Sequence, residues 1–566
     1  MTLPLQKPII LVHLLSRNAR DQLSRELSAL SINIELFICL SIFLIIYTSI
    51  FTMNTQLLLA FAGFALLAQI LVSFVQWLRS PLRSVPGPLL ARYTDFWYFH
   101  RLKQGKFEKV NQELHEQYGP IVRYGPNRYS INDAEALKTV YGHGTQFQKS
   151  EWYIPFQPNE DQWNVFSDRS IQRHAHSRRF YTNAYSMTSL VNYEPYVDEC
   201  GALFSQRLSE FAKAGSTVDI GHWFQCFAFD AVAMMTYGKR LGFLDRGEDI
   251  AQVIDNINKS LVYSSLTGIF PSVHMYIAPL VTGITKRLGM GAKMMYVIDF
   301  TAQTIEEERA SPKTVIEVKG AEDGAAVGET FLTKFLAKHS SNPTEFTNWH
   351  LLIGCASNVF AGSDTTGISI SAIVYHLLKS PDALAKLREE IADFTSRGEL
   401  SQAPSFKESQ KMPYLQAVIK EALRVHPAVG LPLERIVPEG GATIGERFFP
   451  AGSVVGINSW VHHRNTAIFG DDAEKFNPDR WLIENEERIS VMNRNWMPFG
   501  LGSRTCLGKN VSILEMSKLI PRLIRDFDFK LEGAAATPRG AWKTRNAWFV
   551  KPKNFHVKVK SRMAGN

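Results

Sequence analysis

A single cysteine, Cys506, lies in a glycine-rich loop, 498–508, near the end of this 566-residue chain. A sulfur that binds a metal must be a thiolate. Backbone amides freed by Gly502 and Gly508, with the positive end of a following helix at 511–524, would stabilise that charge. Glycines also let the backbone lie close beneath a flat macrocycle. The alternative is a buried structural cysteine, which is the usual state of a free Cys. The setting of Cys506 favours an axial metal ligand.

A second chemical pattern lies within the longest helical pattern, 349–380. There the small residues Ala361 and Gly362 are followed by Asp364 and Thr365. Small side chains would let the helix pass close over a cofactor, and the Thr365 hydroxyl can bond back to the Ala361 carbonyl and open a local kink. For this segment taken alone, a helix with a capped polar bulge is the alternative.

Charged residues at helical spacing accompany these patterns. His174 and Arg178 stand at i and i+4 on a predicted helix, so both could reach one carboxylate of a cofactor. A solvated basic helix face is the alternative. Glu421 and Arg424 stand at i and i+3, which permits a charge-assisted pair, and Arg480 supplies a second guanidinium downstream.

The elements that must position these residues are mostly helical, with a small β-rich region. Two short strands divided by a Gly-Pro-Asn turn are predicted within 118–131, and a strand and turn within 433–441. The segment 198–308 is mostly helical in pattern. Val-Pro-Gly-Pro at 85–88 excludes helix and predicts a stiff elbow before the catalytic body.

Two apolar stretches near the N-terminus, 32–52 and 57–78, have about the length of membrane spans. Arginines precede the first stretch and follow the second, so a helical hairpin would place both of these positive flanks in the cytosol. Alternatively the natural product begins at Met53 with a single anchor. We therefore expect an anchor region, 1–84, and a cytosolic catalytic domain, 85–566.

The composition excludes some classes of protein. The net charge of +8 is spread along the chain without a basic block, which argues against binding to nucleic acid. The five cysteines are widely spaced and form no Cys-x-x-Cys, so neither a disulfide framework nor a zinc site is indicated. This pattern favours a reducing compartment.

The order of these pieces resembles the cytochrome P-450 family from residue 57 to near the C-terminus. The pieces are the anchor, the proline elbow, the basic helix, Ala-Gly-x-Asp-Thr-Thr, Glu-x-x-Arg, Phe-x-Pro-x-Arg and Phe-x-x-Gly-x-Arg-x-Cys-x-Gly. The wording at 124–128 and 476–481 is similar to fungal microsomal members of the pisatin demethylase-like group. The resemblance implies a cytochrome P-450 fold, mainly α with a small β-rich region.

The resemblance also implies a function and roles for residues. The function is a haem-thiolate monooxygenase that inserts one oxygen atom from O2 into an apolar small molecule, by hydroxylation, demethylation or a related oxidation, in fungal secondary metabolite biosynthesis. Cys506 would be the axial ligand of haem b, and Asp364 and Thr365 would deliver protons to oxygen. Further residues implied to contact the haem are His174, Arg178, Arg435, Phe499 and Arg504, although family members commonly have Trp where His174 stands. Those implied to form a buried ion network for folding and haem incorporation are Glu421, Arg424 and Arg480.

Electrons must come from another protein, because no Gly-x-Gly-x-x-Gly opens a βαβ unit that would bind a flavin or nicotinamide. The resemblance implies an NADPH-dependent flavoprotein reductase on the same endoplasmic reticulum membrane, with the catalytic domain facing the cytosol. The acidic docking face of such a reductase would suit Lys509, Lys518, Arg522 and Arg525, which could equally be an ordinary solvated face.

Two other functions keep the haem. One is a haem-thiolate isomerase or dehydratase that rearranges a peroxide without a reductase, and the pair of Asp364 and Thr365 argues against it. The other is a membrane-tethered haem sensor without turnover. Product formation that depends on O2, NADPH and reductase would separate all three.

Overall fold

The structure is a computed structural model of the chain. It describes scattered residues between 60 and 75, and then residues 77–157, 162–287, 296–311, 330–537 and 540–562. The predicted apolar stretch 32–52 lies outside the described residues, and 57–78 lies only partly inside them. Within the described part of the chain, none of the helices combines the length and apolar character needed to cross a bilayer.

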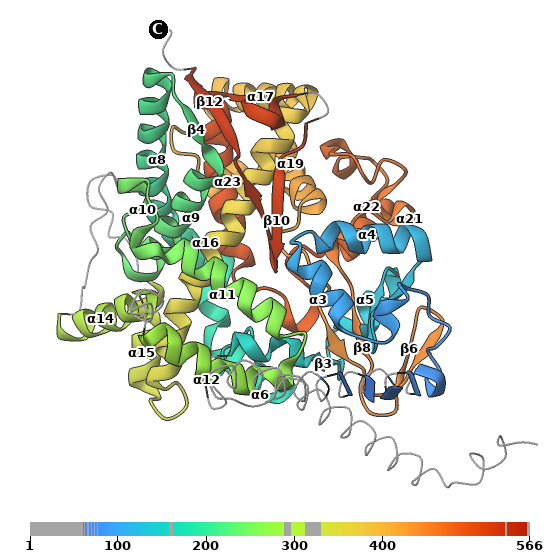
Figure 1. The fold of residues 1–566 in the computed structure, drawn as a ribbon. Helices are drawn as coiled ribbons and strands as arrows, with labels where there is room; N and C mark the ends of the chain where they lie inside the picture. Colours follow the sequence, from blue (N-terminus) through green and yellow to red (C-terminus); the bar gives the residue numbers. More distant parts are fainter. Residues whose placement is uncertain are drawn as a thin grey trace, which may run out of the picture.

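Helices make up most of the described chain, as the sequence predicts (Figure 1). The central ones are α8 (Glu194–Ala214), α9 (Ile220–Tyr237), α16 (Asn348–Lys379), α19 (Pro413–Val425) and α23 (Lys509–Asp526). The others are α3 (Phe96–Lys103), α4 (Phe107–Tyr118), α5 (Ala134–Tyr141), α6 (Ile171–Tyr181), α7 (Met187–Leu190), α10 (Phe243–Arg246), α11 (Val253–Thr267), α12 (Pro271–Arg287), α14 (Tyr296–Ala310), α15 (Phe331–Ser341), α17 (Pro381–Ser396), α18 (Phe406–Gln410), α20 (Ser459–His462), α21 (Thr466–Phe469) and α22 (Glu486–Asn495).

The long helix α16 crosses the middle of the molecule (Figure 1). It begins after a capping box in which Thr347 and His350 satisfy each other's free amides, and Pro381 then starts the next helix. Two glycines bring it against α9. A Cβ on Gly362 would stand 3.1 Å from Val232, and one on Gly367 3.0 Å from the Cα of Gln225. Gly362 therefore faces α9, whereas the sequence pattern placed it over a cofactor.

The strands of the described residues form four small sheets. A five-stranded sheet has the order β1-β2-β8-β5-β3, with β1 (Ile121–Gly125), β2 (Arg128–Ile131), β8 (Val454–Gly456), β5 (Arg435–Ile436) and β3 (Gln148–Lys149). The remaining sheets are β4-β12-β9, with β4 (Thr217–Asp219), β12 (His556–Ser561) and β9 (Phe527–Leu531), the hairpin β10 (Lys543–Ala547) and β11 (Phe549–Lys553), and the hairpin β6 (Ala442–Ile444) and β7 (Arg447–Phe449).

The five-stranded sheet forms the predicted small β-rich region, beside α3, α4 and α5 and away from α8 and α9 (Figure 1). Strands β1 and β2 confirm the prediction for 118–131. The proline elbow packs on this sheet, since the Arg123 amide donates to the Pro86 carbonyl at 2.8 Å. A Cβ on Gly87 would lie 2.2 Å from the Arg123 carbonyl oxygen, so only glycine allows this approach.

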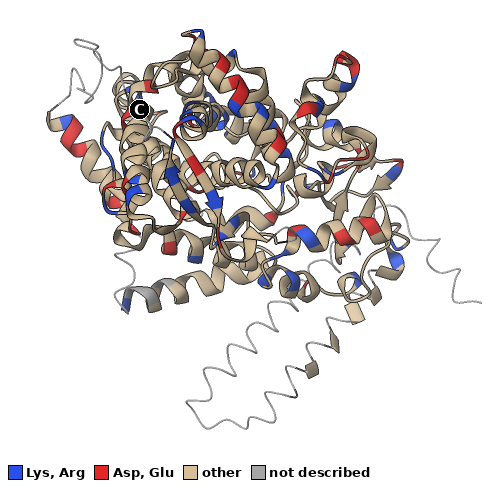
Figure 2. Ribbon diagram, turned by 90° about the horizontal axis from the view of Figure 1, so that it is seen from above, with Lys and Arg blue, Asp and Glu red and all other residues tan. Residues whose placement is uncertain are grey.

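Charges of both signs are spread over the helices (Figure 2). The expectation that Lys518 belongs to an exposed basic face is wrong. Its side chain is only 3 % exposed, and its ammonium lies 2.7 Å from Glu194 and 3.0 Å from Asp198. Arg525 likewise donates to the Ser401 carbonyl, at 2.9 Å. Lys518 therefore forms an internal ion pair that joins α23 to α8 and is not part of an exposed basic face. The Arg525 guanidinium is held by the neighbouring backbone.

Candidate active site

The cysteine loop is held by glycine conformations that other residues reach with difficulty. Gly500 and Gly502 have φ angles of +70° and +62°. A Cβ on Gly502 would stand 1.7 Å from the Tyr141 carbonyl oxygen, so the loop can pass α5 only as glycine. The Cys506 amide donates to the Phe499 carbonyl at 2.9 Å, which closes the loop just before α23.

The environment of the Cys506 thiol contains opposing influences. Burial raises the pKa of this thiol, while the backbone amides of Gly508 and Lys509 and the charge of Arg178 oppose that rise. These amides belong to the start of α23, as the helix argument predicts. The Gly502 carbonyl accepts from the Thr505 hydroxyl at 2.8 Å within the loop, and a contribution of the Gly502 amide stays a prediction. A metal bound to the sulfur would favour the thiolate outright.

The Cys506 side chain is accessible although protein surrounds it. Ala361 is likewise exposed within the otherwise buried middle of α16. The Thr366 hydroxyl donates to Ser512 at 3.1 Å, which holds this part of α16 beside α23. A flat cofactor between the cysteine loop and α16 fits this arrangement.

A cluster of cations lies near the cysteine loop. Burial, followed by the charges of Arg504, Lys149, Arg178 and Arg435, lowers the pKa of His174 to about 3, so this imidazole is neutral. Burial and the neighbouring Arg435 lower the pKa of Arg504 to about 10. These shifts show that His174, Arg178, Arg435 and Arg504, predicted separately from the sequence, converge on one region.

Among the described residues, no carboxylate forms an ion pair with Lys149, Arg178, Arg435 or Arg504, although the charge of Asp168 acts on Lys149 and Arg504. The nearby carboxylates are engaged elsewhere, because Asp168 pairs with Arg173 at 2.7 Å and Glu434 with Arg128 at 2.7 Å. Lys149 and Arg435 stand directly opposite each other on β3 and β5, where like charges are unfavourable. Buried cations without a counter-charge are costly. Within the described residues, this cluster therefore fits a ligand that brings carboxylates, such as the two propionates of haem.

Lys149 is the member that the sequence pattern did not reveal. Burial lowers its pKa well below the usual value, and the charges of Arg435 and Arg504 add to that effect. Its ammonium donates to the Phe166 carbonyl and lies 4.2 Å from the centre of the Tyr153 ring. A lysine at the end of a short strand, shortly before the aromatic turn 151–156, is the signal that could have found it.

The remaining predicted contacts are structurally well defined. Arg504 donates to the Asp168 carbonyl at 2.6 Å, just before α6. Arg435 donates to the Glu434 carbonyl at 2.9 Å and lies 5.0 Å from the centre of the Tyr141 ring. Phe499 packs edge to face on Trp496, with ring centres 5.8 Å apart. Their contact with a haem stays a prediction.

Asp364 and Thr365 have different surroundings on α16. The Thr365 hydroxyl donates to the Ala361 carbonyl at 2.8 Å, as predicted, and α16 continues as helix across this bond. Asp364 is fully buried, with its carboxylate 2.5 Å from the Lys551 ammonium, and it also accepts from the Gln225 amide. Thr365 therefore lies beside Ala361 on the accessible side, and Asp364 is bound by neighbouring elements.

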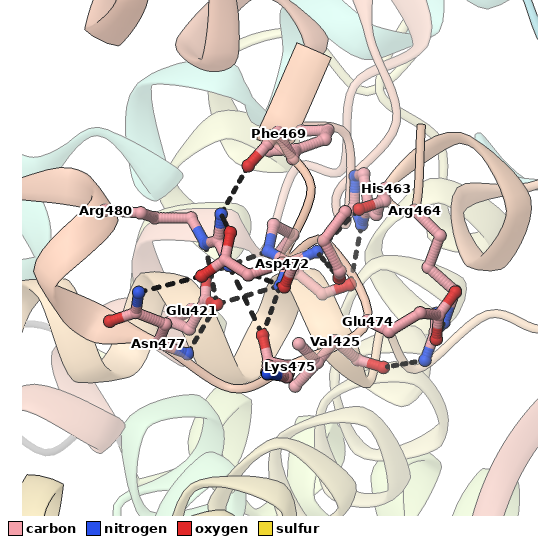
Figure 3. Close-up of polar contacts among 12 residues, drawn as sticks. Glu421, Val425, His463, Arg464, Phe469, Asp472, Glu474, Lys475, Asn477 and Arg480 are labelled. Atoms are coloured by element: carbon pink, nitrogen blue, oxygen red, sulfur yellow. Dashed lines mark hydrogen bonds and ion pairs between the residues drawn. The ribbon is translucent and has the colours of Figure 1, made fainter. Parts of the chain in front are cut away.

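The predicted ion network is present and buried (Figure 3). Glu421 accepts from Arg424 at 2.8 Å, from the side chain of Arg480 at 2.9 Å and from Trp481 at 2.9 Å. The Asn477 backbone amide adds a further bond at 2.9 Å. One carboxylate thus joins α19 to the turn η6 (Pro478–Trp481), which agrees with a role in folding.

Comparison with known proteins gives the family. Residues 86–559 match the family model described as Cytochrome P450. A pisatin demethylase of Fusarium vanettenii is 36% identical over 490 residues, which cover 86% of this chain and 91% of that protein. Cytochrome P450 monooxygenases of Aspergillus terreus and Emericella nidulans are 35% and 36% identical and cover 84% and 86% of this chain, and 95% of their own lengths.

The site and the matches define an oxidoreductase with a haem-thiolate cofactor. The chain belongs to the cytochrome P450 family.

Proposed function

We propose that this protein is a haem b monooxygenase that inserts one oxygen atom from O2 into an apolar small molecule, by hydroxylation, demethylation or a related oxidation, in fungal secondary metabolism. The observation that carries the proposal is the convergence of an accessible Cys506, surrounded by protein, with cations that form no ion pair with a carboxylate among the described residues. The similarity to a pisatin demethylase supports demethylation as one such reaction.

The chain's own residues hold the cofactor and set its orientation. Bound haem supplies the oxidising power of the reaction. Cys506 would ligate the iron, and Lys149, Arg178, Arg435 and Arg504 would neutralise the propionates. His174 is neutral, so it would donate a hydrogen bond without adding charge.

Residues of α16 would supply the protons of the reaction. The Thr365 hydroxyl lies next to the exposed Ala361 and can donate or accept a proton at its oxygen. Asp364, one residue earlier, is the nearest acid along the helix. The alcohol would therefore orient protons at the reacting side, and the acid would replenish them.

An NADPH-dependent flavoprotein reductase would supply the electrons, and the endoplasmic reticulum membrane, with the catalytic domain on the cytosolic side, is the proposed location. One observation supports attachment to a membrane. Tyr276, Leu280 and Ile284 stand at successive i+4 positions on α12, and all three are exposed, as is Met275. An apolar stripe on a surface helix is typical of contact with a lipid interface.

Carbon monoxide binding tests the haem ligand. The reduced protein with carbon monoxide should show the strongly red-shifted Soret band of thiolate ligation, and Cys506→His should lose it. Cys200→Ala, which removes a buried cysteine of the helical core, should keep the band. If Cys506→His also kept it, the ligand assignment would be wrong.

Turnover tests the reaction class. Pisatin is a suitable first probe because oxidative removal of a methyl group releases formaldehyde. With a fungal NADPH-dependent reductase, formaldehyde or hydroxylated product should require O2, NADPH and the reductase together. Product that forms from a peroxide substrate without the reductase would favour the isomerase. Metabolites that accumulate in a deletion strain would identify the natural substrate.

A further inference from the structure

One buried ion pair joins the acid of α16 to the C-terminal hairpin. The Lys551 ammonium on β11 lies 2.5 Å from an oxygen of Asp364. The Asp364 side chain is 0 % exposed and that of Lys551 is 18 % exposed. The amide of Gln225 on α9 donates to the other carboxylate oxygen. One oxygen of Asp364 therefore accepts a hydrogen bond from α9, and the other contacts the ammonium of β11 as an ion pair without hydrogen-bond geometry.

Lys551 also reaches a third element. Its ammonium donates to the Asn258 side-chain oxygen on α11 at 2.6 Å. An ammonium has three hydrogens, so it can serve Asp364 and Asn258 at the same time. A single side chain of β11 thus connects α16 with α11.

This placement bears on how Asp364 can act. A nearby cation attracts a carboxylate and fixes its direction, and loss of the cation would leave the carboxylate free to turn. Successive residues on a helix point about 100° apart, so an Asp364 bound to Lys551 and Gln225 is turned away from the Thr365 hydroxyl. Its two partners, Lys551 and Gln225, are both partly exposed, so the carboxylate can exchange protons with solvent only past these two side chains.

We propose that Lys551 is a positioning residue that holds the Asp364 carboxylate toward β11 and connects this acid to α11. The inference rests on the proposed function, in which Asp364 replenishes protons. A purely structural pair would be replaceable by apolar side chains at little cost. A positioning pair must instead change proton supply when it is broken.

The test compares Lys551→Met and Lys551→Arg in the haem-loaded protein. Lys553→Met is the matched control, because Lys553 lies on the same strand and is exposed. Pisatin turnover is driven once by NADPH, reductase and O2, and once by hydrogen peroxide, which brings its own protons. We expect Lys551→Met to lower kcat about tenfold in the O2-driven reaction, with KM and the peroxide-driven rate within about twofold of wild type.

Two further variants complete the activity measurements. Lys551→Arg should restore most of the O2-driven rate, and Asp364→Asn should add no further loss to Lys551→Met, because both changes break the same supply. Equal losses in the two reactions would show a general defect in the site and overturn the proposal. Additive losses in the double variant would do the same.

A stability arm tests the pair without any turnover. Lys551→Met should lower the melting temperature by leaving a buried carboxylate unpaired, and Asp364→Asn should reverse most of that fall. Amide exchange in 253–267 should quicken in Lys551→Met and not in Lys553→Met. Unchanged melting and exchange would disprove the link. If the stability measurements confirm the link between Lys551 and Asp364 but the wild-type protein forms no O2-dependent product, only the proposed function is contradicted.

Discussion

At the scale of single residues, neighbouring side chains on α16 have separate tasks. Thr365 bonds to its own helix beside an accessible alanine, while Asp364 is bound to α9 and β11. The alcohol is therefore free to meet a ligand, and the acid is not. Substitution of Thr365 should lower the amount of product formed per NADPH consumed. Substitution of Asp364 should lower the overall rate of turnover.

We predict that Thr365→Ala still binds haem and still consumes NADPH with the reductase, but releases more hydrogen peroxide. Product per NADPH should fall about tenfold, which corresponds to ~1.4 kcal/mol in the competition between two outcomes. The control is Ser363→Ala, because Ser363 makes the same back-bond, to Val359 at 2.7 Å, on the buried side. NADPH, peroxide and product are measured for each variant. An unchanged peroxide fraction in Thr365→Ala would refute the role.

The site residues that the sequence predicts lie within short motifs, whereas the residues that it missed meet the site only through contacts between distant segments. Cys506 and Arg504 belong to one short motif, so their proximity follows from the loop itself. Lys149 meets Arg435 only because β3 pairs with β5 across a long separation in sequence. Lys551 meets Asp364 in the same way. No spacing rule within one element predicts such contacts.

At the scale of elements, the carboxylate of Glu421 fixes the turn η6 against α19. We predict that Glu421→Gln destabilises the protein by about 3–5 kcal/mol, because two arginines then lose their buried counter-charge. Haem content after expression should fall with it. The matched control is Glu474→Gln, because the Glu474 side chain is 68 % exposed in its pair with Arg464. Thermal unfolding and haem per protein are measured, and similar results for both variants would contradict the prediction.

The glycine loop gives a second prediction at this scale. Gly502→Ala should displace the loop and lower haem retention, because its Cβ would overlap the Tyr141 carbonyl. Gly533→Ala is the control. Gly533 has a similar φ of +69° but open space around it, so it should cost only ~1 kcal/mol. Haem loss to apomyoglobin measures retention. Equal retention in the two variants would show that steric contact at α5 is unimportant.

Elements were also easier to predict than their packing. The apolar period and the turn residues indicated α16, α23 and the strands β1 and β2 close to their observed bounds. Which face of a helix meets which neighbour was not indicated. Gly362 packs on α9 because small residues serve close helix contacts as well as cofactors.

At the scale of the whole molecule, the apolar surface bears on attachment. The exposed residues of α12 and the apolar residues Phe64, Leu67 and Leu71 are far apart in sequence, and each set is accessible. Lysines and arginines near α23 are less available than the sequence implied, since Lys518 is internal. A reductase would therefore have to use other cations around the cysteine loop.

Two N-terminal deletions separate the contributions to membrane attachment. Deleting residues 1–52 should leave the protein in the membrane fraction, because the apolar stretch 57–78 is kept and is long enough to hold it there. Deleting residues 1–83 should release most of the protein at high salt, leaving only weak binding through α12. Fractionation of cell extracts, with a carbonate wash, measures both.

The α12 contribution is tested within the longer deletion. Leu280→Asp and Ile284→Asp together should abolish the remaining binding to phosphatidylcholine vesicles, because charged side chains at these positions cannot enter a lipid interface. The control is Lys553→Asp, which changes an exposed residue of β11, outside α12. A protein that is fully soluble after deletion of 1–52 would show that 57–78 does not anchor it. Unchanged vesicle binding in the double variant would remove α12 from the contact.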